Sequence, residues 1–269
     1  MIDIIVPIKQ VPDMERVKFD TEAGRIDRSS ASGEINPFDL NALEAAVQIK
    51  EKLGGTVTTI SMGPPQAESS VRDSLARGAD RGILLVGKEF AGADTWATSY
   101  ALASAIKKLG KYDLIVCGEK TVDGDTGQVG PEIAEWLAIP HVAYVSKVRE
   151  ASDASVTVLC EMESDRYGIE APLPALITVT KDINAPRLPS FADKMKARKA
   201  EIEQWGAADL ADVADVENFG LKGSPTRLIK VVIPSEEGRK GEVFRGSPED
   251  AAVKVADALQ ALGMLGSAK

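Results

Sequence analysis

The sequence predicts an α/β fold in which a mainly parallel sheet is covered by helices on both faces. In the first two-thirds of the chain, short apolar or β-branched runs alternate with segments that carry apolar residues at helical spacing. The connections are short, and glycines close several helical segments. Such alternation is typical of parallel sheets covered on both faces. Ligands of these sheets bind outside the carboxyl ends of the strands, so we expect a site there.

Four strands and four helices are predicted before residue 140. The strands cover Ile2–Ile8, Thr56–Met62, Gly82–Val86 and Asp113–Cys117. The helices that follow them cover Asp39–Leu53, Gln66–Arg77, Asp94–Leu109 and Gln128–Leu137.

After Pro140 the pattern changes. Strands are predicted at Ser155–Glu161, Arg166–Glu170 and Pro174–Thr180, the first two antiparallel. Residues 206–245 are rich in glycine, proline and charge and predict an extended arm rather than a second core. A final amphipathic helix begins after Ser247, which is a good N-cap. This helix needs a surface to pack on, and a partner chain is one candidate.

Composition excludes several classes of function. The net charge of −9 argues against a general nucleic-acid binder. Cys117 and Cys160 form no CxxC pair, and His141 is the only histidine, so we predict no metal site and no histidine-based catalysis. We expect a structural role for His141 at the start of a strand. Without a basic leader or an apolar run of about 20 residues, we expect a cytoplasmic protein that does not span a membrane.

The loop Asp123–Pro131 is the sharpest candidate for a binding site. It follows the fourth strand and opens a helix, whose first N–H groups attract a phosphate. Gly124, Gly127 and Gly130 allow a tight backbone and close approach to a ligand, and Thr126 is a candidate helix cap. The alternative is an ordinary connection between strand and helix. The residues alone leave both interpretations open.

Two further segments lie at carboxyl ends of predicted strands. Gly63-Pro64-Pro65 makes a stiff shelf that suits the side of a flat ring, although a simple turn is the better explanation of these residues alone. Thr95 and Thr98 place two hydroxyls at a helix start, where they can contact phosphate or ribityl oxygens. The alternative is that Asp94 merely caps this helix.

Two more segments have both a binding interpretation and a purely structural one. Asn36–Asp39 precedes the first helix, which Asp39 can cap, and its exposed backbone is a candidate reader of an adenine edge. The basic segment Lys194–Lys199, preceded by Phe191, is either a docking surface or a solvated stretch of charge.

In combination, these segments resemble the beta subunit of electron transfer flavoproteins. The resemblance runs from Met1 to about Ile202, and more loosely to the C-terminus. It is carried, in this order, by Ile8–Asp13, Asn36–Asp39, Ser61–Pro65, Arg77–Asp80, Cys117-Gly118, Asp123–Pro131 and Met195–Lys199.

The resemblance implies an adenine-nucleotide-binding domain over residues 1–190. Residues 191–269 are then a recognition segment and an arm that packs on the larger alpha subunit of a heterodimer. The implied cofactor-binding residues are Lys9, Asn36, Asp39, Met62, Gly63, Thr95, Thr98, Cys117, Gly118, Asp123, Gly124, Asp125, Thr126, Gly127, Gln128 and Val129. Gly63, Pro64 and Pro65 border a site for NADH. Phe191, Lys194, Lys196, Arg198 and Lys199 dock a dehydrogenase, with Phe191 where well-known members have a leucine.

The family has two functional branches. One holds a structural AMP in the beta subunit and shuttles electrons through a single FAD in the alpha subunit, exchanging them with an acyl-CoA dehydrogenase. The other holds a second FAD, accepts hydride from NADH and bifurcates the electrons to a dehydrogenase and to ferredoxin or flavodoxin. The loop at Gly124–Pro131 and the shelf at Met62–Pro65 are similar to those of the bifurcating branch. No side chain is then required as a catalytic acid or base.

Two rival classes share the predicted fold. An adenylating ligase of this fold carries a glycine- and serine-rich pyrophosphate loop after its first strand, but this chain has Pro7–Val11 there. A stand-alone adenine-nucleotide sensor needs neither the basic segment nor the arm.

Overall fold

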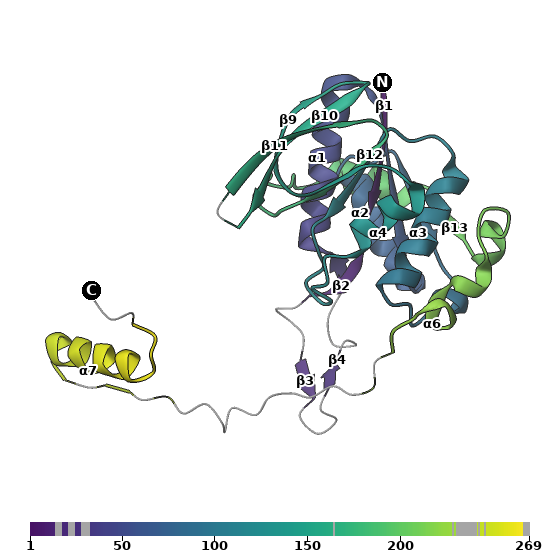
Figure 1. Ribbon diagram of the computed structural model, residues 1–269. Coiled ribbons are helices and arrows are strands. Elements are labelled where there is room, and N and C mark those ends of the chain that lie inside the picture. The colour runs from purple at the N-terminus through teal and green to yellow at the C-terminus, as the bar shows by residue number, and fades with distance from the viewer. Residues whose placement is uncertain are drawn as a thin grey trace. The chain divides into compact units, whose positions relative to one another are not determined.

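The computed structural model describes residues 1–13, 18–20, 25–27, 33–163, 165–227, 229, 241, 243–244 and 246–265 (Figure 1). The chain divides into two compact units, Met1–Leu228 and Ile229–Lys269. Each unit is described by itself.

The first unit is built on a nine-stranded sheet with the order β11-β10-β9-β12-β8-β1-β6-β7-β13. All neighbours from β9 to β13 run parallel, whereas β10 is antiparallel to both β9 and β11. The strands are β1 (Ile2–Pro7), β6 (Gly55–Met62), β7 (Arg81–Leu85), β8 (Leu114–Gly118), β9 (His141–Ala151), β10 (Ser155–Met162), β11 (Asp165–Pro172), β12 (Ala175–Val179) and β13 (Glu203–Trp205). Two small ribbons pair β2 (Gln10–Pro12) with β5 (Gly33–Ile35), and β3 (Lys18–Asp20) with β4 (Arg25–Asp27).

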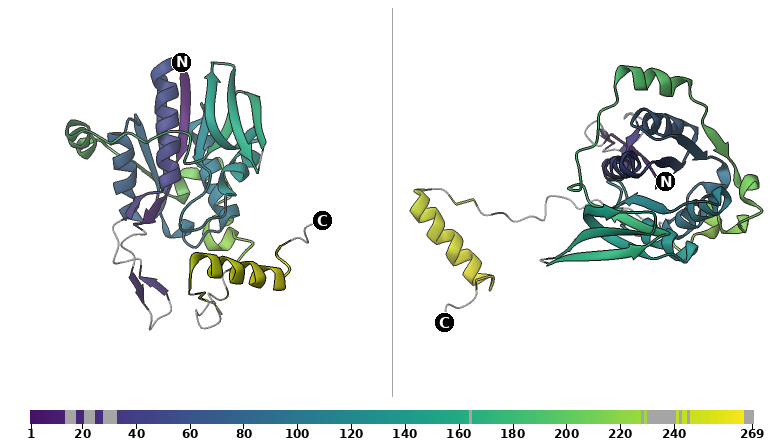
Figure 2. Two further views of the ribbon diagram at one scale, coloured as in Figure 1. Left: turned by 90° about the vertical axis from the view of Figure 1, so that its left-hand side faces the viewer. Right: turned by 90° about the horizontal axis from the view of Figure 1, so that it is seen from above.

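Helices cover both faces of the sheet because successive side chains of each strand point to opposite faces (Figure 2). Ile4 and Val6 pack with α1 (Pro37–Leu53) and α2 (Glu68–Ala76). Ile5 packs in a second core with α3 (Thr95–Leu109) and α4 (Val129–Leu137). The remaining helices are α5 (Phe191–Lys199), α6 (Gly220–Gly223) and α7 (Pro248–Ala261), with short 3-10 turns η2 (Pro65–Ala67), η3 (Lys88–Phe90), η4 (Ala207–Leu210) and η5 (Val216–Asn218).

The predicted α/β class is therefore confirmed. The predicted strands and helices up to residue 180 are present, with boundaries that differ by a few residues at most. His141 begins β9 as expected and is exposed there.

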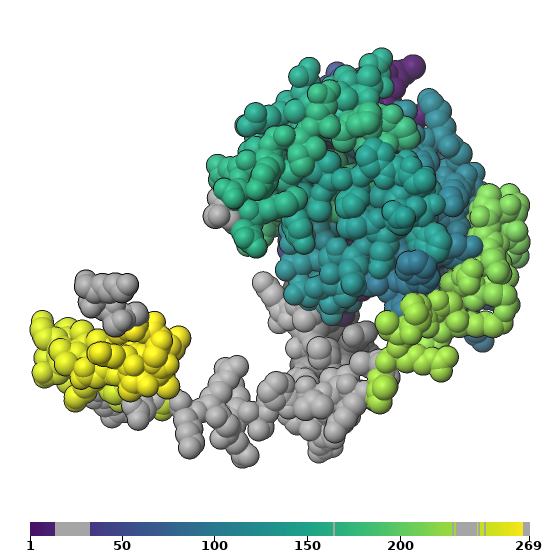
Figure 3. Space-filling view, in the orientation of Figure 1, coloured from purple at the N-terminus to yellow at the C-terminus, as the bar shows by residue number. Residues whose placement is uncertain are grey.

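Residues 203–223 differ from the expected arm. β13 adds a parallel strand beside β7, and η4, η5 and α6 follow. This segment (light green in Figure 3) lies against α3. Leu210 and Phe219 are buried, and Phe219 stacks on Phe90 with ring centroids 5.1 Å apart. Single buried apolar residues that lie far apart create no periodicity in the sequence. The hydrophobic pattern therefore predicts no helix or strand in this segment. The first unit extends to residue 228 and includes this segment.

The second unit contains α7. As predicted, Ser247 caps it by accepting a hydrogen bond of 3.2 Å from the Asp250 N–H, and Pro248 lies in the first turn. Within the described residues, α7 buries none of its side chains in this chain.

Candidate nucleotide-binding site

The candidate residues gather at the carboxyl edge of the parallel strands, which is the lower edge of the sheet in Figure 1. β1 lies between β8 and β6, so the chain crosses from one side of β1 to the other when it enters β8. The connection after β1 leads to α1 on one face, and β8 is entered from α3 on the other. In parallel sheets, ligands bind in the crevice at such a change of direction, so we take the space between these two connections as the candidate crevice.

Lys9 links the two sides of this crevice. Its N–H donates to Asp39 Oδ2 at 2.8 Å, and its carbonyl accepts the Asn36 N–H at 2.9 Å. Its ammonium bonds both carboxylate oxygens of Asp123 at 2.8 Å. Burial alone would raise the pKa of Asp123, but the hydrogen bond and charge of Lys9, together with a hydrogen bond from Thr121, hold this pKa below its ordinary value.

Asn36 has a role that its sequence context does not indicate. It is 0% exposed, and its side-chain amide spans to the loop after β8. Nδ2 donates to the Lys120 carbonyl at 2.8 Å, and Oδ1 accepts the Val122 N–H at 3.1 Å. The expectation of an exposed adenine-reading backbone is wrong for Asn36, because both its N–H and its side chain are used within the protein. Asn36 instead braces the phosphate-loop candidate.

Asp39 is not the helix cap that the sequence suggests. Asn36 holds the N-cap position of α1, and Asp39 lies in the first turn with its carboxylate directed to Lys9. Burial raises the pKa of Asp39 to about 7. The Lys9 and Gly118 N–H groups favour its charged form, but they do not offset the effect of burial. A side chain at Gly118 would overlap Asp39 Oδ1, so only glycine fits at this crossing.

Cys117 is buried at the end of β8 and belongs to the core on the α3 and α4 face. Burial, with the nearby Asp39 charge, raises the pKa of its thiol well above the ordinary value. The protonated thiol is a poor nucleophile and metal ligand. Cys117 therefore contributes by filling space in the core.

The amino terminus of α4 is open toward the crevice. Gln128 holds the N-cap position, and no side chain of the described residues caps it. Thr126 is exposed and is not the predicted cap. Gly127 has a φ of +64° and Asp125 a φ of +52°, and the Asp125 carboxylate pairs with Lys120 at 2.8 Å. Uncapped N–H groups at a helix start attract anions, so this terminus suits a phosphate.

Gly130 serves a different purpose from the one expected. It is buried, and a Cβ there would lie 2.6 Å from Thr178 Cγ2 of β12. The glycine allows α4 to approach the sheet, not a ligand to approach the loop. Gly124 lies in the exposed turn before it.

Thr95 lies against the first turn of α4. Its Oγ1 lies 3.2 Å from Glu132 Oε1 and 3.4 Å from Gln128 Oε1. Thr98 lies one turn further along α3 and is half-buried. Asp94 caps α3 by accepting the Ala97 N–H at 3.0 Å. Glu132 was not anticipated, although its place in the first turn of the helix after β8 was a usable signal.

Gly63-Pro64-Pro65 follows β6 and leads into the 3-10 turn η2. The Gly63 N–H donates to the Leu85 carbonyl of β7 at 3.1 Å, and Pro64 and Pro65 are exposed. Met62 is half-buried against the core. Gly63, Pro64 and Pro65 thus present a rigid, exposed border at the same sheet edge as the loop.

The basic segment forms α5, which is anchored at its carboxyl end. Arg72 Nη1 lies 2.7, 3.0 and 2.9 Å from the carbonyls of Ala197, Arg198 and Ala200. Phe191 is 80% exposed. Lys194, Lys196, Arg198 and Lys199 are exposed as well.

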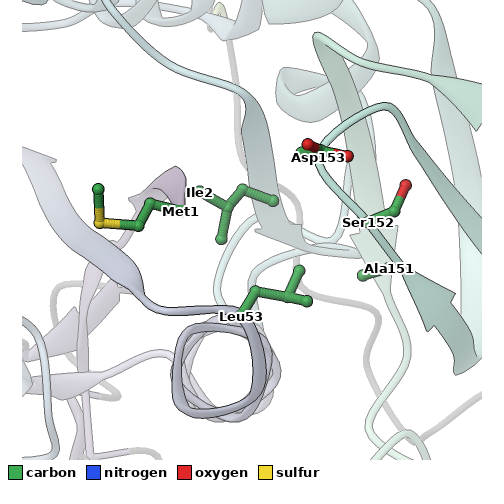
Figure 4. A pocket seen from close by; sticks show the side chains of 6 residues that line it. All are labelled: Met1, Ile2, Leu53, Ala151, Ser152 and Asp153. Atoms are coloured by element: carbon green, nitrogen blue, oxygen red, sulfur yellow. The ribbon is translucent and has the colours of Figure 1, made fainter.

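A hollow of about 310 Å³ lies at the opposite, amino edge of the sheet (Figure 4). It is lined by Met1, Ile2, Leu53, Ala151, Ser152 and Asp153. None of the predicted site residues reaches it.

Comparison with known proteins decides the family. The model of the electron transfer flavoprotein domain matches residues 23–210. The chain is 45% identical to the electron transfer flavoprotein subunit beta of Thermoanaerobacterium thermosaccharolyticum, over 96% of this chain and 98% of that one. This chain belongs to the electron transfer flavoprotein beta subunits.

Two further relatives carry other names. Protein FixA of Bradyrhizobium diazoefficiens is 42% identical over 92% of this chain and 88% of its own. The caffeyl-CoA reductase-Etf complex subunit CarD of Acetobacterium woodii is 42% identical over 91% of this chain and 92% of its own. These matches extend beyond the family domain, so the likeness to electron transfer flavoprotein beta subunits covers nearly the whole chain. In the described part of the chain, no helix has the length and apolarity to cross a membrane.

Proposed function

We propose that this beta subunit binds FAD at the carboxyl edge of β1, β6 and β8 and there accepts hydride from NADH. With an alpha subunit, it passes one electron through the alpha FAD to a flavin-dependent dehydrogenase and the other to ferredoxin or flavodoxin. When bound, FAD supplies both the hydride acceptance and the one-electron transfers. The chain supplies binding, orientation and exclusion of water, and it acts in the cytoplasm.

The open amino terminus of α4 is the observation that carries the proposal. Its N–H groups are uncapped, and the loop before it is braced by Asn36 and by the Lys9–Asp123 pair. A helix terminus held in place in this way supports a diphosphate without a basic side chain in the loop at the phosphates. The residues present therefore fit a dinucleotide.

Each segment has a part in this proposal. Lys9, Asp39, Cys117 and Gly118 surround the adenosine end, Asn36 braces the neighbouring loop, and the loop Asp123–Val129 holds the phosphates. Met62, Gly63, Thr95 and Thr98 support the rest of the cofactor. Gly63, Pro64 and Pro65 border the nicotinamide.

Proton transfer by a histidine is not part of the proposal. His141 pairs with Leu176 near the start of β12, at the amino edge of the sheet, whereas the site lies at the carboxyl edge. Cys117 is held as a buried, protonated thiol. The proposed chemistry needs neither residue as an acid or base.

The proposed partner surfaces are places where this chain leaves large or charged side chains exposed. The docking segment of Phe191, Lys194, Lys196, Arg198 and Lys199 offers an exposed aromatic ring among cations, which suits an acidic surface on a dehydrogenase. α7 offers exposed apolar side chains, among them Val253 and Val255, to the alpha subunit. The relative named as a subunit of a caffeyl-CoA reductase-Etf complex supports a partner of the dehydrogenase class.

A count of nucleotides tests the proposal. The heterodimer with its alpha subunit is purified and denatured, and the released nucleotides are separated and quantified. Two FAD molecules per heterodimer are expected. One FAD with one AMP would contradict the proposal and favour the AMP-containing electron shuttle instead. A chain that purifies as a nucleotide-loaded monomer in the presence of the alpha subunit would favour a sensor.

A further inference from the structure

Thr95, Gln128 and Glu132 form a polar cluster between the first turns of α3 and α4. One hydroxyl, Thr95 Oγ1, lies within hydrogen-bonding reach of two oxygens, Glu132 Oε1 at 3.2 Å and Gln128 Oε1 at 3.4 Å. A hydroxyl carries a single hydrogen and can satisfy only one acceptor at a time. The cluster is therefore rich in acceptors and short of donors.

Glu132 Oε2 is a further acceptor without a donor in the described part of the chain. It is enclosed, and no donor of the described residues hydrogen-bonds to it. Exchanging the oxygen and nitrogen of the Gln128 amide would give Thr95 a donor, but it would leave Oε2 as it is. A buried carboxylate oxygen without a donor is unfavourable, so this oxygen suits a ligand that brings a hydroxyl.

The position of the cluster limits which ligand can bring that hydroxyl. Both helices begin at the carboxyl edge of the sheet, and Gln128 is itself the N-cap of the open α4 terminus. A hydroxyl that reaches Glu132 therefore belongs to the part of the ligand next to its phosphates. In FAD this part is the ribityl polyol. AMP ends at its phosphate and has hydroxyls only on the ribose of its adenosine.

Charge does not separate the two ligands. A terminal phosphate monoester carries about −1.5 to −2 charges at neutral pH, and the two phosphates of a dinucleotide together carry about as much. Glu132 therefore favours a dinucleotide through the added contact to its polyol.

We infer that Glu132, oriented by Thr95, accepts a hydrogen bond from the polyol of a bound flavin dinucleotide and selects it over AMP. This inference rests on the proposed binding of FAD by this subunit. Glu132 is a specificity-determining residue, and Thr95 is its positioning residue.

The test measures binding and not turnover. Heterodimers carrying E132A, E132Q, T95V or the control E135A are stripped of nucleotide, and FAD and AMP are titrated separately. E132A is expected to weaken the binding of FAD to the beta site by about tenfold or more, since a hydrogen bond to a charged group is lost. Its affinity for AMP is expected to stay equal or rise. E132Q keeps one acceptor and is expected to weaken FAD binding less.

The other variants separate this role from a structural one. Glu135 is exposed one turn along the same helix, so E135A is expected to bind both nucleotides as the wild type does. T95V loses the hydroxyl that orients Glu132 and is expected to weaken FAD binding severalfold without affecting AMP. It also serves as the second test if E132A fails to fold.

The outcomes distinguish the inference from the proposed function. Equal losses of FAD and AMP affinity in E132A and T95V, or no loss in either, would overturn the inference alone. A wild-type heterodimer that releases AMP in place of a second FAD would overturn both.

Discussion

Asp39 shows how burial and charge compete at a single residue of the site. It is 6% exposed, yet it accepts the Lys9 N–H and lies against Gly118. Burial raises its pKa to about 7 in the folded protein, from an ordinary value of 3.8. The folded state therefore holds this proton more tightly than the unfolded state does. The stability that results is fully present below about pH 4 and is lost as the pH rises to about 7.

The variant D39N is expected to remove this pH dependence. Between pH 4 and 7, the free energy of unfolding of the wild type should fall by up to about 1.4 kcal/mol per pH unit more than that of D39N. Chemical denaturation of both chains at pH 5, 6, 7 and 8 measures the two slopes. Parallel slopes would show that Asp39 is charged throughout this range, and the stated cause would be wrong.

At the residue scale, the sequence does not predict which partners each candidate side chain contacts. Asn36 was flagged, but its partners Lys120 and Val122 lie more than 80 positions further along the chain. Local patterns carry no information about such contacts. The same holds for Asp39 and Gly130, whose surroundings come from other strands, and for Glu132, whose partner Thr95 lies on a different helix.

At the element scale, the placement of α4 depends on the fit between one glycine and one threonine. In G130A, the new methyl group would lie 2.6 Å from Thr178 Cγ2 and push α4 away from β12. We expect a loss of about 1–3 kcal/mol of stability and weaker nucleotide binding, because the helix terminus moves with α4.

A second substitution tests this account. T178S removes Cγ2 but keeps the hydroxyl that accepts the Tyr144 N–H at 3.2 Å. The double variant G130A/T178S should therefore regain most of the lost stability, measured by thermal unfolding. If the losses of the two single variants simply add, the contact between the two residues is not the cause.

α5 is an element whose position depends on its ends. Among its residues in the described structure only Ala197 is buried, so apolar packing contributes little. Arg72 instead donates to three carbonyls at its carboxyl end, and at its start Ser190 accepts the Asp193 N–H at 3.1 Å. The docking segment is thus held in place mainly by polar contacts.

Removing the Arg72 anchor should expose α5 to protease. In R72Q, we expect trypsin to cleave after Lys194, Lys196, Arg198 and Lys199 about tenfold faster or more. The loss of hydrogen bonds from a charged group lowers the free energy needed to open α5 locally. Mass spectrometry of a time course measures the rate. R149Q, which changes an exposed arginine of β9, should leave it unchanged. Equal rates in R72Q and the wild type would mean that other contacts hold α5.

Element prediction succeeded where apolar runs are long and failed where single residues anchor the chain. β1, β6 and α1 each bury several apolar side chains in a regular pattern, which the sequence displays directly. β13 has three residues and pairs with β7 through its backbone, and backbone pairing leaves no mark on composition. The segment after it depends on Leu210 and Phe219, which lie too far apart to create periodicity.

For the whole molecule, alternation of strands and helices predicted a parallel sheet and placed the site at its carboxyl edge. It did not predict the strand order, in which β1 is central and β8 lies on the side away from β6. The order of the strands along the chain does not determine on which side of the sheet each following strand pairs. That choice creates the crevice between the connections after β1 and β8, and so it decides which of the flagged segments meet.

The division into two units leads to a final prediction for the whole molecule. The first unit, Met1–Leu228, contains both hydrophobic cores and all candidate nucleotide-binding residues. In the second unit, α7 buries no described side chain within the chain and exposes Val253 and Val255, and Leu262 just after it is exposed as well. A helix of 14 residues without a packing partner is marginal in water, which is why α7 is expected to find its partner on another chain.

A chain of residues 1–228 should therefore melt within about 2 °C of the full chain when each is measured alone, because a difference below about 0.5 kcal/mol moves the midpoint by no more than that. It should also keep its nucleotide affinity. Its association with the alpha subunit, measured by sedimentation velocity, should weaken strongly, because the apolar surface of α7 is absent. A fall in melting temperature of more than about 5 °C for the isolated chain would instead place residues 229–269 among the contacts that stabilise the first unit.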